Sequence, residues 1–472
     1  MTSDAAHKSA DNKLQSLFES WEEAGIRVCI WKSADRWQEG LEGKTDFDLL
    51  LAPHDLTEAK EILIRHGWLP VIAESWRSFD GLSDYVSLKD QGNHHIHLHT
   101  QIASGEKLIK SLRPPLTELY LNETRQAYPP FVSSELEFII FIVRVIVKLN
   151  WIDRLGAVRR RSSSSLYRNY VKEYKPLRDA VDLPSLQKLL RHPELGALPT
   201  DVILTAYEDL TLVNWRARRE LLKAIAPWRI TSGLSAKWAA LKRSHAKRKY
   251  GVGKHLETPA VTIAVCGADG SGKTTLTDAL QKHLSRHLKV SRFYLGSNIL
   301  YAERRRRFIY RIFWPPYLVI RKLFKILNLK SAQSSIEGLF TRFNESLVRQ
   351  EKALRLGTAA RAALEGHIVL FERYPLFTPF GDDLTPSLTQ EMPDLLVMLD
   401  VSETTALDRR EDDPEEDIKA KVVVFRDTAT RLQAEGERVL ICSENESVEE
   451  RVAKIVNAMD DLLVTRAQAQ QT

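Results

Sequence analysis

The stretch VCGADGSGKTTL, residues 265–276, decides the fold of this chain. Four of its residues occupy the fixed positions of the pattern GxxxxGK(S/T): Gly267, Gly272, Lys273 and Thr274. Glycines there let the backbone fold so that its amide hydrogens converge on phosphate oxygens, the lysine reaches the β- and γ-phosphates, and the hydroxyl suits magnesium. An apolar strand pattern over residues 263–266 precedes the loop and a helical pattern follows it, so the helix N-terminus adds a favourable dipole.

This context predicts an ATP site rather than a glycine-rich turn that binds nothing. The residues expected to contact the nucleotide run through the whole loop: Gly267, Ala268, Asp269, Gly270, Ser271, Gly272, Lys273, Thr274 and Thr275. Among them, Lys273 is expected to take part in catalysis and Thr274 to bind Mg²⁺.

Length and composition describe a globular protein of two or three domains. The chain has 472 residues, 43% hydrophobic and 28% charged, and its formal net charge of +6 is modest for this length. The three cysteines have no CxxC spacing and lie in apolar runs, which predicts buried thiols in a reducing compartment rather than disulfides or a zinc site. No secretory signal is visible and the first thirteen residues are polar, so a cytoplasmic location and a disordered N-terminus are expected.

The most apolar stretch of the chain is FIIFIVRVIVKLNWI, residues 138–152. Arg144 and Lys148 interrupt it, and it is too short to span a bilayer. A buried helix is therefore expected here instead of a membrane anchor.

The spacing of apolar residues divides the chain into four parts. Residues 14–132 alternate helix and strand patterns, residues 133–236 are helical, and residues 237–257 form a basic stretch expected to be a linker. Over residues 258–465 strand and helix patterns alternate, which predicts a parallel sheet with helices on both faces. The expected fold class is α/β multidomain: an N-terminal α+β domain, a helical middle and a C-terminal P-loop domain.

The P-loop part resembles the thymidylate kinase branch of P-loop kinases. The loop carries Asp269 inside Gly-x-Asp-Gly-x-Gly-Lys-Thr-Thr. HIVLFERYPL, residues 367–376, is similar to the strand with an Asp-Arg-Tyr signature in that family, and PDLLVMLDVSETTALDRR, residues 393–410, resembles the segment that leads into its arginine-bearing lid. The resemblance covers about residues 258–465 in the family's order, and it places Asp269 near the acceptor sugar; a loop-shaping role for this aspartate is the alternative.

The same resemblance suggests roles for four charged residues beyond the loop. Glu372 would hold magnesium or its waters, and Arg373 would hold the acceptor phosphate. Arg409 and Arg410 would close over the transferring phosphoryl group. The alternatives are a local ion pair for Glu372 and Arg373, and a solvated helix end for Arg409 and Arg410.

Two departures from the family indicate an acceptor other than dTMP. The thymidylate kinases carry an Arg-Glu-Pro-Gly-Gly-like stretch after their second strand, whereas VSRFYLG, residues 290–296, runs here into SNILYAERRRRF, residues 297–308. Glutamate also replaces the usual aspartate before Arg373. The expected partners are ATP and a phosphorylated small-molecule or glycan-related acceptor.

Residues 301–330 form a basic and aromatic insert with nine basic residues and one acidic residue. One interpretation is a pair of helices broken at Pro315–Pro316, which pack on the kinase and expose their arginines. Another is an amphipathic segment, residues 304–325, on an anionic bilayer, which would place the protein at the inner membrane face. A large anionic acceptor, a nucleic acid or a protein partner also stays open, and all are less expected than the first two.

The other informative stretch is WKSADRWQEGLEGKTDFDLLL, residues 31–51. Asp46 and Asp48 are two apart on a strand, so both carboxylates point to one face and can bind a divalent metal and a triphosphate. With Lys32 and Ser33 at the end of the preceding strand, this resembles the nucleotidyltransferase fold, in which a small-residue turn precedes an Asp-x-Asp pair.

That fold takes a third carboxylate from a neighbouring strand, and the candidate strand HHIHLHTQI, residues 94–102, contains none. Its residues His95, His97 and His99 share one face. One interpretation is a Mn²⁺ or Zn²⁺ site on Asp46, Asp48 and His97, and the other is an inert polar strand face.

The predicted function is an ATP- and Mg²⁺-dependent phosphotransferase of the thymidylate or nucleoside monophosphate kinase type. Nucleotidyl transfer at Asp46 and Asp48, with the P-loop domain as an ATP-dependent switch, is the alternative. The combination of the two halves resembles bacterial proteins linked to surface polysaccharide gene clusters. A third hypothesis is therefore a non-enzymatic, membrane-associated regulator of polysaccharide synthesis.

Overall fold

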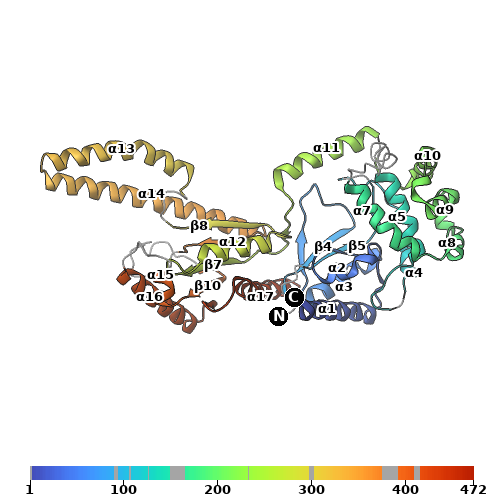
Figure 1. The fold of residues 1–472 in the computed structure, drawn as a ribbon, viewed down its shortest axis with the longest axis horizontal. Helices are drawn as coiled ribbons and strands as arrows, with labels where there is room; N and C mark the ends of the chain where they lie inside the picture. The colour runs from blue at the N-terminus through green and yellow to red at the C-terminus, as the bar shows by residue number, and fades with distance from the viewer. Residues whose placement is uncertain are drawn as a thin grey trace. The chain divides into compact units, whose positions relative to one another are not determined.

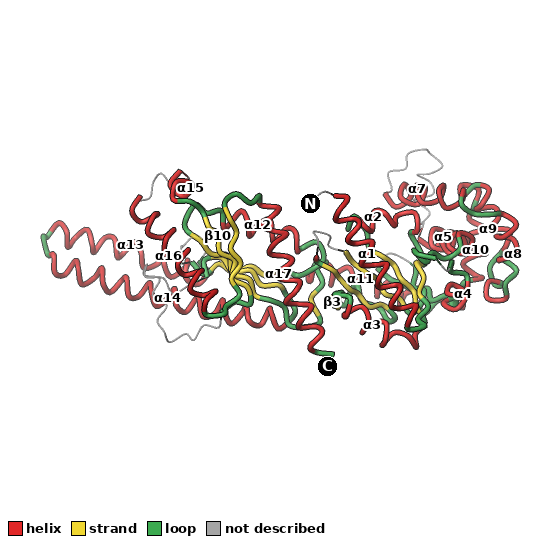
Figure 2. The backbone as a smooth tube through the Cα atoms, turned by 90° about the horizontal axis from the view of Figure 1, so that it is seen from below, coloured by secondary structure: helices red, strands yellow, loops and turns green. Residues whose placement is uncertain are grey.

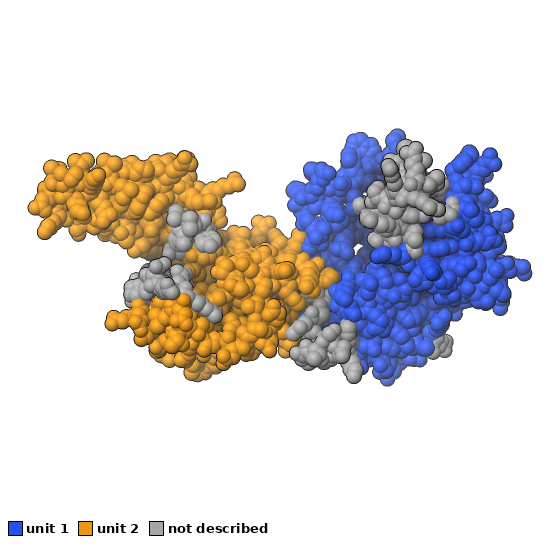
Figure 3. Space-filling model, viewed as in Figure 1, with its two compact units in different colours: residues 1–254, 464–472 blue, residues 255–463 orange. Residues whose placement is uncertain are grey.

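The computed structural model divides the chain into two compact units, which Figure 3 distinguishes by colour. Unit 1 consists of Met1–Lys254 and Val464–Thr472, and unit 2 of His255–Leu463. The structure describes residues 3–89, 94–105, 108–125, 127–148, 165–231, 233–296, 302–374, 392–408 and 415–471. The division after Lys254 lies inside the predicted linker segment, residues 237–257.

Unit 1 begins with a mixed sheet and three helices. Its strands lie in the order β1-β2-β5-β4-β3; β2 and β5 are parallel and the other neighbours antiparallel. The strands are β1 (Val28–Ile30), β2 (Phe47–Leu51), β3 (Leu69–Ile72), β4 (Leu82–Ser87) and β5 (His94–His99). The helices, which share one buried cluster with this sheet, are α1 (Ser3–Glu23), α2 (Trp37–Leu41) and α3 (Leu56–Arg65).

Alternation along β2 separates core from site. Phe47, Leu49 and Leu51 pack into the cluster with α1 and α3, because side chains two apart on a strand share a face. Asp46 and Asp48 consequently belong to the opposite face. The face on which the two carboxylates meet the histidines of β5 is therefore set by the apolar pattern of the strand.

Helix α1 corrects the expectation that the first thirteen residues are disordered. The helix begins at Ser3, and Ala10, Leu14, Leu17 and Trp21 along it are buried. These residues recur at helical spacing and form part of the sheet's core. The segment is therefore helical because it buries an apolar stripe, although its overall composition is polar.

The middle of unit 1 is helical. Its helices are α4 (Thr117–Asn122), α5 (Ser134–Lys148), α7 (Ser165–Asp179), α8 (Leu183–Leu189), α9 (Thr200–Glu208) and α10 (Trp215–Ala224). α5 carries the most apolar stretch of the chain, and eleven of its residues are buried, each large apolar side chain contributing about 1.5–3 kcal/mol. Among the described residues, no helix is both long and apolar enough to cross a membrane.

The predicted linker is largely helical. Helix α11 (Gly233–Tyr250) covers residues 237–250 of it, and most of its side chains are exposed. Between residues 234 and 250 there is neither proline nor glycine, and alanine, leucine, lysine and arginine dominate, all of which favour helix. The scarcity of large apolar residues therefore indicated a surface helix here, and not a linker without secondary structure.

Unit 2 contains a five-stranded sheet in the order β11-β10-β7-β9-β8, in which every neighbouring pair is parallel. The strands are β7 (Thr262–Gly267), β8 (Val290–Tyr294), β9 (Ile368–Glu372), β10 (Leu395–Asp400) and β11 (Val439–Ser443); the short β6 (His255–Leu256) precedes them. The predicted parallel sheet is thus confirmed. Because β7 lies in the middle, its carboxyl end is flanked by the ends of β9 and β10.

Helices lie on both faces of this sheet, as Figure 2 shows. They are α12 (Lys273–Leu284), α13 (Arg304–Ile326), α14 (Lys330–Leu364), α15 (Glu403–Asp408), α16 (Glu415–Ala434) and α17 (Val448–Ala469). α14 and α16 share one buried cluster with the sheet, through small and aliphatic residues such as Ala362 and Leu432. α12 and α17 lie on the opposite face.

The basic insert forms α13, which pairs with α14 as a hairpin that extends away from the sheet of unit 2 (Figure 1). The expected break at Pro315–Pro316 does not occur, because α13 continues through both prolines. Of the aromatic side chains on either side of them, Tyr317 stacks on Phe340 of α14 and Trp314 packs against the same ring at a tilt. This packing offsets the backbone hydrogen bonds that the prolines remove.

Candidate functional site

The phosphate-binding loop joins the end of β7 to the start of α12. Gly267, Gly270 and Gly272 have φ of 147°, 82° and 90°, which L-residues with side chains rarely adopt. A Cβ atom on Gly267 would also lie 2.9 Å from the Leu399 carbonyl oxygen of β10. The predicted strand–loop–helix context is therefore present, and two of its glycines meet the predicted pattern for steric reasons.

Lys273 is bent back over the loop. Its Nζ donates to the carbonyl oxygens of Gly267 at 2.9 Å and Ala268 at 2.6 Å. Burial lowers the pKa of Lys273 to about 8. A phosphate at the loop would meet this ammonium directly and would favour its charged form.

Asp269 lies among three cations. Its Oδ1 accepts a hydrogen bond from Arg373 Nη2 at 3.1 Å and lies 3.7 Å from Lys273 Nζ, and its Oδ2 lies 3.5 Å from Lys421 Nζ of α16. The structure therefore brings the predicted residues Asp269, Lys273 and Arg373 together. Arg373 has a φ of 53°, a left-handed backbone that costs about 1–3 kcal/mol and that clusters at functional sites.

Glu372 ends β9 and is buried. Arg292 of β8 pairs with its carboxylate and also with Asp278 of α12. Arg292 was not predicted from the sequence, where its only signal is a cation inside the strand pattern VSRFYLG. Glu372 and Thr274 line the same cavity, and a carboxylate with a hydroxyl is the oxygen donor set that suits Mg²⁺.

These groups surround a cavity of about 590 Å³. Its walls are the loop and first turn of α12 (residues 269–276), Tyr294 at the end of β8, and Glu372–Arg373. The connection between β11 and α17 and the start of α17 close the remaining side, with Glu444, Glu446, Ser447, Val448 and Arg451. The volume suits a nucleotide together with a small second ligand. The predicted lid residues Arg409 and Arg410 lie outside the described residues.

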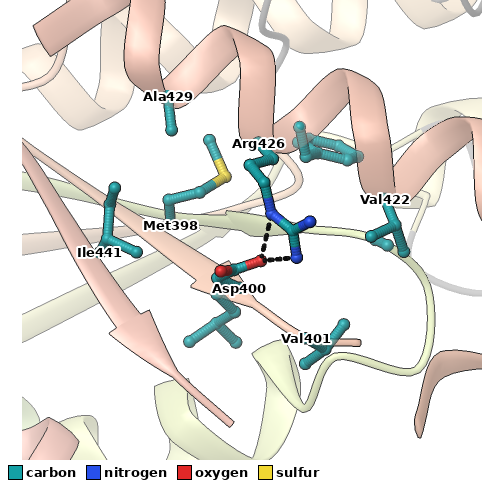
Figure 4. A pocket seen from close by; sticks show the side chains of 10 residues that line it. Met398, Asp400, Val401, Val422, Arg426, Ala429 and Ile441 are labelled. Carbon is teal, nitrogen blue, oxygen red and sulfur yellow. Dashed lines mark hydrogen bonds and ion pairs between the residues drawn. The ribbon is translucent and has the colours of Figure 1, made fainter. Parts of the chain in front are cut away.

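A smaller cavity lies behind the loop, between β10 and α16 (Figure 4). Its volume of about 20 Å³ is enough for one water molecule but not for a ligand. At its edge Arg426 donates to Asp400 Oδ1 through Nε at 3.0 Å and Nη2 at 2.7 Å. The pair ties α16, which carries Lys421, to the end of β10, so this feature positions the site rather than forming one.

The second site lies on the polar face of the unit 1 sheet. His97 Nε2 is 3.1 Å from Asp46 Oδ2, and His99 Nε2 is 3.2 Å from Asp48 Oδ1. Lys32 Nζ pairs with Asp48 Oδ1 at 2.8 Å. The structure thus brings the predicted metal-site residues Asp46, Asp48 and His97 onto one face.

Asp84 of β4 is the carboxylate that the sequence argument did not find. It lies opposite His97 in the antiparallel β4–β5 register. Asp84 Oδ1 is 3.2 Å from His95 Nε2 and 2.7 Å from His97 Nδ1, and the latter contact lacks hydrogen-bond geometry. A third carboxylate on this face therefore comes from β4, beyond the histidine strand, and the only sequence signal was one acidic residue in LSDYVSL.

Lys254 completes this cluster from a distant part of the chain. Its side chain is buried, and Nζ lies 2.9 Å from Asp84 Oδ1 and also contacts His95 Nε2. Trp76 Nε1 donates to the Gly251 carbonyl at 2.9 Å, which holds the segment before Lys254 against unit 1. An ammonium ion therefore lies where two imidazoles and a carboxylate converge.

Comparisons with known proteins add little to this picture. No protein-family model matches the chain, and no curated protein does either. One solved structure to which the chain is similar is a deoxyadenosine kinase from M. mycoides with bound dATP. The similarity has a TM-score of 0.26 at 14% identity and spans 42% of this chain and 98% of that kinase chain. A likeness this weak carries no information about the acceptor or the reaction.

The donor atoms of Asp84, His95 and His97 lie within 4.8 Å of one another. One carboxylate oxygen with two imidazole nitrogens is a donor set that suits Zn²⁺ or Mn²⁺. The residues present therefore fit such an ion. This set shares His97 with the predicted metal site, but its carboxylate comes from β4 instead of from the start of β2. Lys254 would compete with the ion for Asp84.

The protonation states on this face follow from burial and from neighbours. Burial opposes ionisation of Asp46 and Asp84, yet contacts from His95 and His97 hold the pKa of both carboxyls well below their usual range. Burial alone would lower the pKa of His97, but its contacts with Asp46 and Asp84 raise it. Burial lowers the pKa of His99 to about 4. At neutral pH His97 is consequently the imidazole that most favours a positive charge.

A pocket of about 290 Å³ opens beside these residues. Asp46, Asp48, His97 and His99 form part of its wall. The rest combines four apolar residues with four basic ones, Lys32, Arg77, Lys110 and Arg243. Burial lowers the pKa of Lys110 to about 7. Arg243 of α11 donates to the Leu108 and Ser78 carbonyls at 3.1 and 3.2 Å. The helix that occupies the predicted linker thus closes one side of this pocket.

Proposed function

We propose that the chain is an ATP- and Mg²⁺-dependent phosphotransferase of the nucleoside monophosphate kinase type, whose acceptor carries a phosphate and is not dTMP. The convergence of Lys273, Asp269 and Arg373 on one cavity carries this proposal. Arg373, at the end of a neighbouring strand, supplies the same cavity with a cation for a phosphate group beyond those that the loop holds. Phosphoryl transfer needs such positioned cations on both sides of the transferring group.

The loop amides and Lys273 would hold the ATP phosphates, and Thr274 with Glu372 would hold the magnesium ion. Bound magnesium supplies neutralisation of the phosphate charge. Arg373 would orient the acceptor phosphate, and Asp269 would hold the Arg373 guanidinium through the 3.1 Å hydrogen bond. Arg292 would hold the Glu372 carboxylate in place through its ion pair. Arg409 and Arg410 stay predicted as the lid.

The acceptor would enter beside Tyr294, on the side of α13 and α14. A pocket of about 300 Å³ near the end of β8 is lined by Arg305, Arg306 and Arg355, with Glu303 and Glu351 as the acidic residues. Its excess of cations favours a negatively charged acceptor, such as a phosphorylated sugar or another glycan-related phosphate.

Mass spectrometry of ATP incubated with the purified protein, Mg²⁺ and a pool of small metabolites tests the proposal. We expect ADP and a product heavier by one phosphoryl group, both lost in Lys273→Ala. Lys282→Ala, an exposed lysine on the same helix, is the matched control and should keep the activity. ADP and inorganic phosphate alone, with no phosphorylated product, would contradict the proposal and favour an ATP-dependent switch.

Nucleotidyl transfer in unit 1 is the second candidate function. Asp84 favours it, because Asp46, Asp48 and Asp84 together provide three carboxylates beside a cation-lined pocket. The same incubation separates it from the first candidate. Pyrophosphate and a nucleotidylated product, lost in Asp46→Asn and kept in Lys273→Ala, would move the main chemistry to unit 1.

A further inference from the structure

Helix α13 has an inward face that is fixed by packing on α14. Tyr317 stacks on Phe340 with ring centroids 4.1 Å apart, and Trp314 lies 5.3 Å from the same ring. Arg306 is buried and pairs with Glu351 of α14 at 2.9 Å. These contacts determine which residues of α13 point away from the hairpin.

The outward face carries a stripe of exposed apolar side chains. Their spacings of four, seven, four and three residues keep them on one side of a helix. The stripe consists of Phe308, Ile312, Val319, Leu323 and Ile326, which are 65%, 48%, 60%, 50% and 72% exposed. A contiguous apolar row of this length on a surface marks a site of interaction.

Cations that form no ion pair with another described residue flank this stripe. Residues 304–326 contain no aspartate or glutamate. Within the described part of the chain, the ion pairs of α13 are Arg306–Glu351 and Arg321–Glu337. The cations outside these pairs are Arg304, Arg305, Arg307, Arg311, Lys322 and Lys325. The face thus combines an apolar centre with a margin of uncompensated positive charge.

We propose that the outward face of α13 docks on the surface of an anionic lipid bilayer. The apolar stripe would enter the boundary between headgroups and acyl chains, and the flanking cations would contact the anionic headgroups. A second copy of this chain fits poorly, because pairing like faces would bring these cations against each other. A nucleic acid would use the cations but leave Phe308, Val319 and Ile326 exposed. In Figure 1 the hairpin extends away from the sheet of unit 2, and the residues of the stripe are exposed.

Sedimentation of the full-length protein with vesicles tests this proposal. We expect binding to vesicles with 3:7 phosphatidylglycerol to phosphatidylcholine, and at least tenfold weaker binding to pure phosphatidylcholine. Each cation near an anionic surface is worth roughly fivefold in partitioning. A variant with Arg307→Gln, Arg311→Gln, Lys322→Gln and Lys325→Gln should therefore bind at least ~100-fold more weakly.

The matched control removes the same charge from exposed positions of unit 1, with Lys188→Gln, Arg216→Gln, Arg219→Gln and Lys223→Gln. It should bind vesicles within about threefold of the parent, a smaller change than one cation at the surface is worth. A second variant, with Phe308→Ser, Val319→Ser and Ile326→Ser, should lose binding although its charge is unchanged. Lys273→Ala should bind normally, so this proposal and the proposed phosphotransferase can fail separately.

Equal binding to neutral and anionic vesicles, or no binding to either, would overturn the proposal. The proposal would also be overturned if both α13 variants still bound vesicles while binding was lost on introducing Lys237→Gln, Lys242→Gln and Arg248→Gln into α11. Light scattering tests whether a second copy of the chain binds this face instead. If the parent forms a dimer, does not bind vesicles, and becomes a monomer in the Phe308 variant, the face is a dimer interface. Circular dichroism confirms that each variant keeps the parent's helix content.

Discussion

The two polar sites of this molecule are built in opposite ways. The phosphate-binding loop is contiguous, and its geometry depends on glycines within six residues of one another, Gly267 to Gly272. The histidine and aspartate face of unit 1 is assembled from three strands and from Lys254, which is 170 positions away from its partner Asp84. The first site can therefore be recognised from a sequence motif, whereas the second depends on strand order and on one long-range ion pair.

Removal of Lys273 should produce the largest effect, because the loop site depends on one cation at the point where charge develops. We expect Lys273→Ala to lower phosphoryl transfer by about 1,000-fold, the upper end for loss of one stabilising donor. Single-turnover assays with the acceptor found by mass spectrometry measure it. A loss below about tenfold, the scale of an ordinary binding contact, would place the charge stabilisation on other residues.

Loss of Lys254 should destabilise unit 1 by about 3 kcal/mol, because Lys254→Met removes the lysine partner of the buried Asp84 carboxylate and leaves it only the imidazoles of His95 and His97. Urea unfolding followed by tryptophan fluorescence measures it. All tryptophans except Trp314 belong to unit 1, so the signal reports mainly that unit.

The double variant Asp84→Asn with Lys254→Met tests whether the effect comes from the Lys254–Asp84 ion pair. It should recover most of the stability lost in Lys254→Met. Lys237→Met, at an exposed position of α11, is the control and should have no measurable effect. If Lys254→Met is as stable as the parent, the cluster does not depend on the ammonium ion.

Metal binding sharpens the same comparison. If Lys254 competes with a cation for Asp84, Lys254→Met should bind Zn²⁺ at least tenfold more tightly than the parent, about 1.4 kcal/mol. Titration against a chromophoric chelator measures the affinity, and His97→Ala in the Lys254→Met background should abolish the gain. Equal affinities in parent and variant would show that lysine and metal do not share the position.

The smallest expected effect is a pH dependence of ATP binding at the loop. The pKa of Lys273 is lowered to about 8, so below pH 8 the amine is already charged and binding needs no proton. Above pH 8 it is mostly neutral and must take up a proton to meet the phosphates, so affinity should fall about fivefold between pH 8 and pH 9. Calorimetry in buffers of different ionisation enthalpy should show this proton uptake, and Lys273→Met should show neither effect.

Much of unit 2 could be predicted from its sequence. The parallel sheet and the loop follow from patterns that repeat locally, and the structure confirms both. Arg292 could not be predicted, because its pairing with Glu372 arises only when β8 lies beside β9. The continuity of α13 through Pro315–Pro316 was also missed, since aromatic stacking on α14 outweighs the local preference for a break.

By itself the sequence determined the nucleotide loop, the strand that presents Asp46 and Asp48 on one face, and the basic character of α13. These properties depend on backbone sterics and on side-chain periodicity, which act over a few residues. Only the tertiary structure decided that Asp84 is the third carboxylate, that Lys254 neutralises it, and that the stripe on α13 faces outward. Each of these depends on which helices and strands lie side by side. Burial in a common core decides that arrangement, and it produces no pattern that can be recognised within a short stretch of sequence.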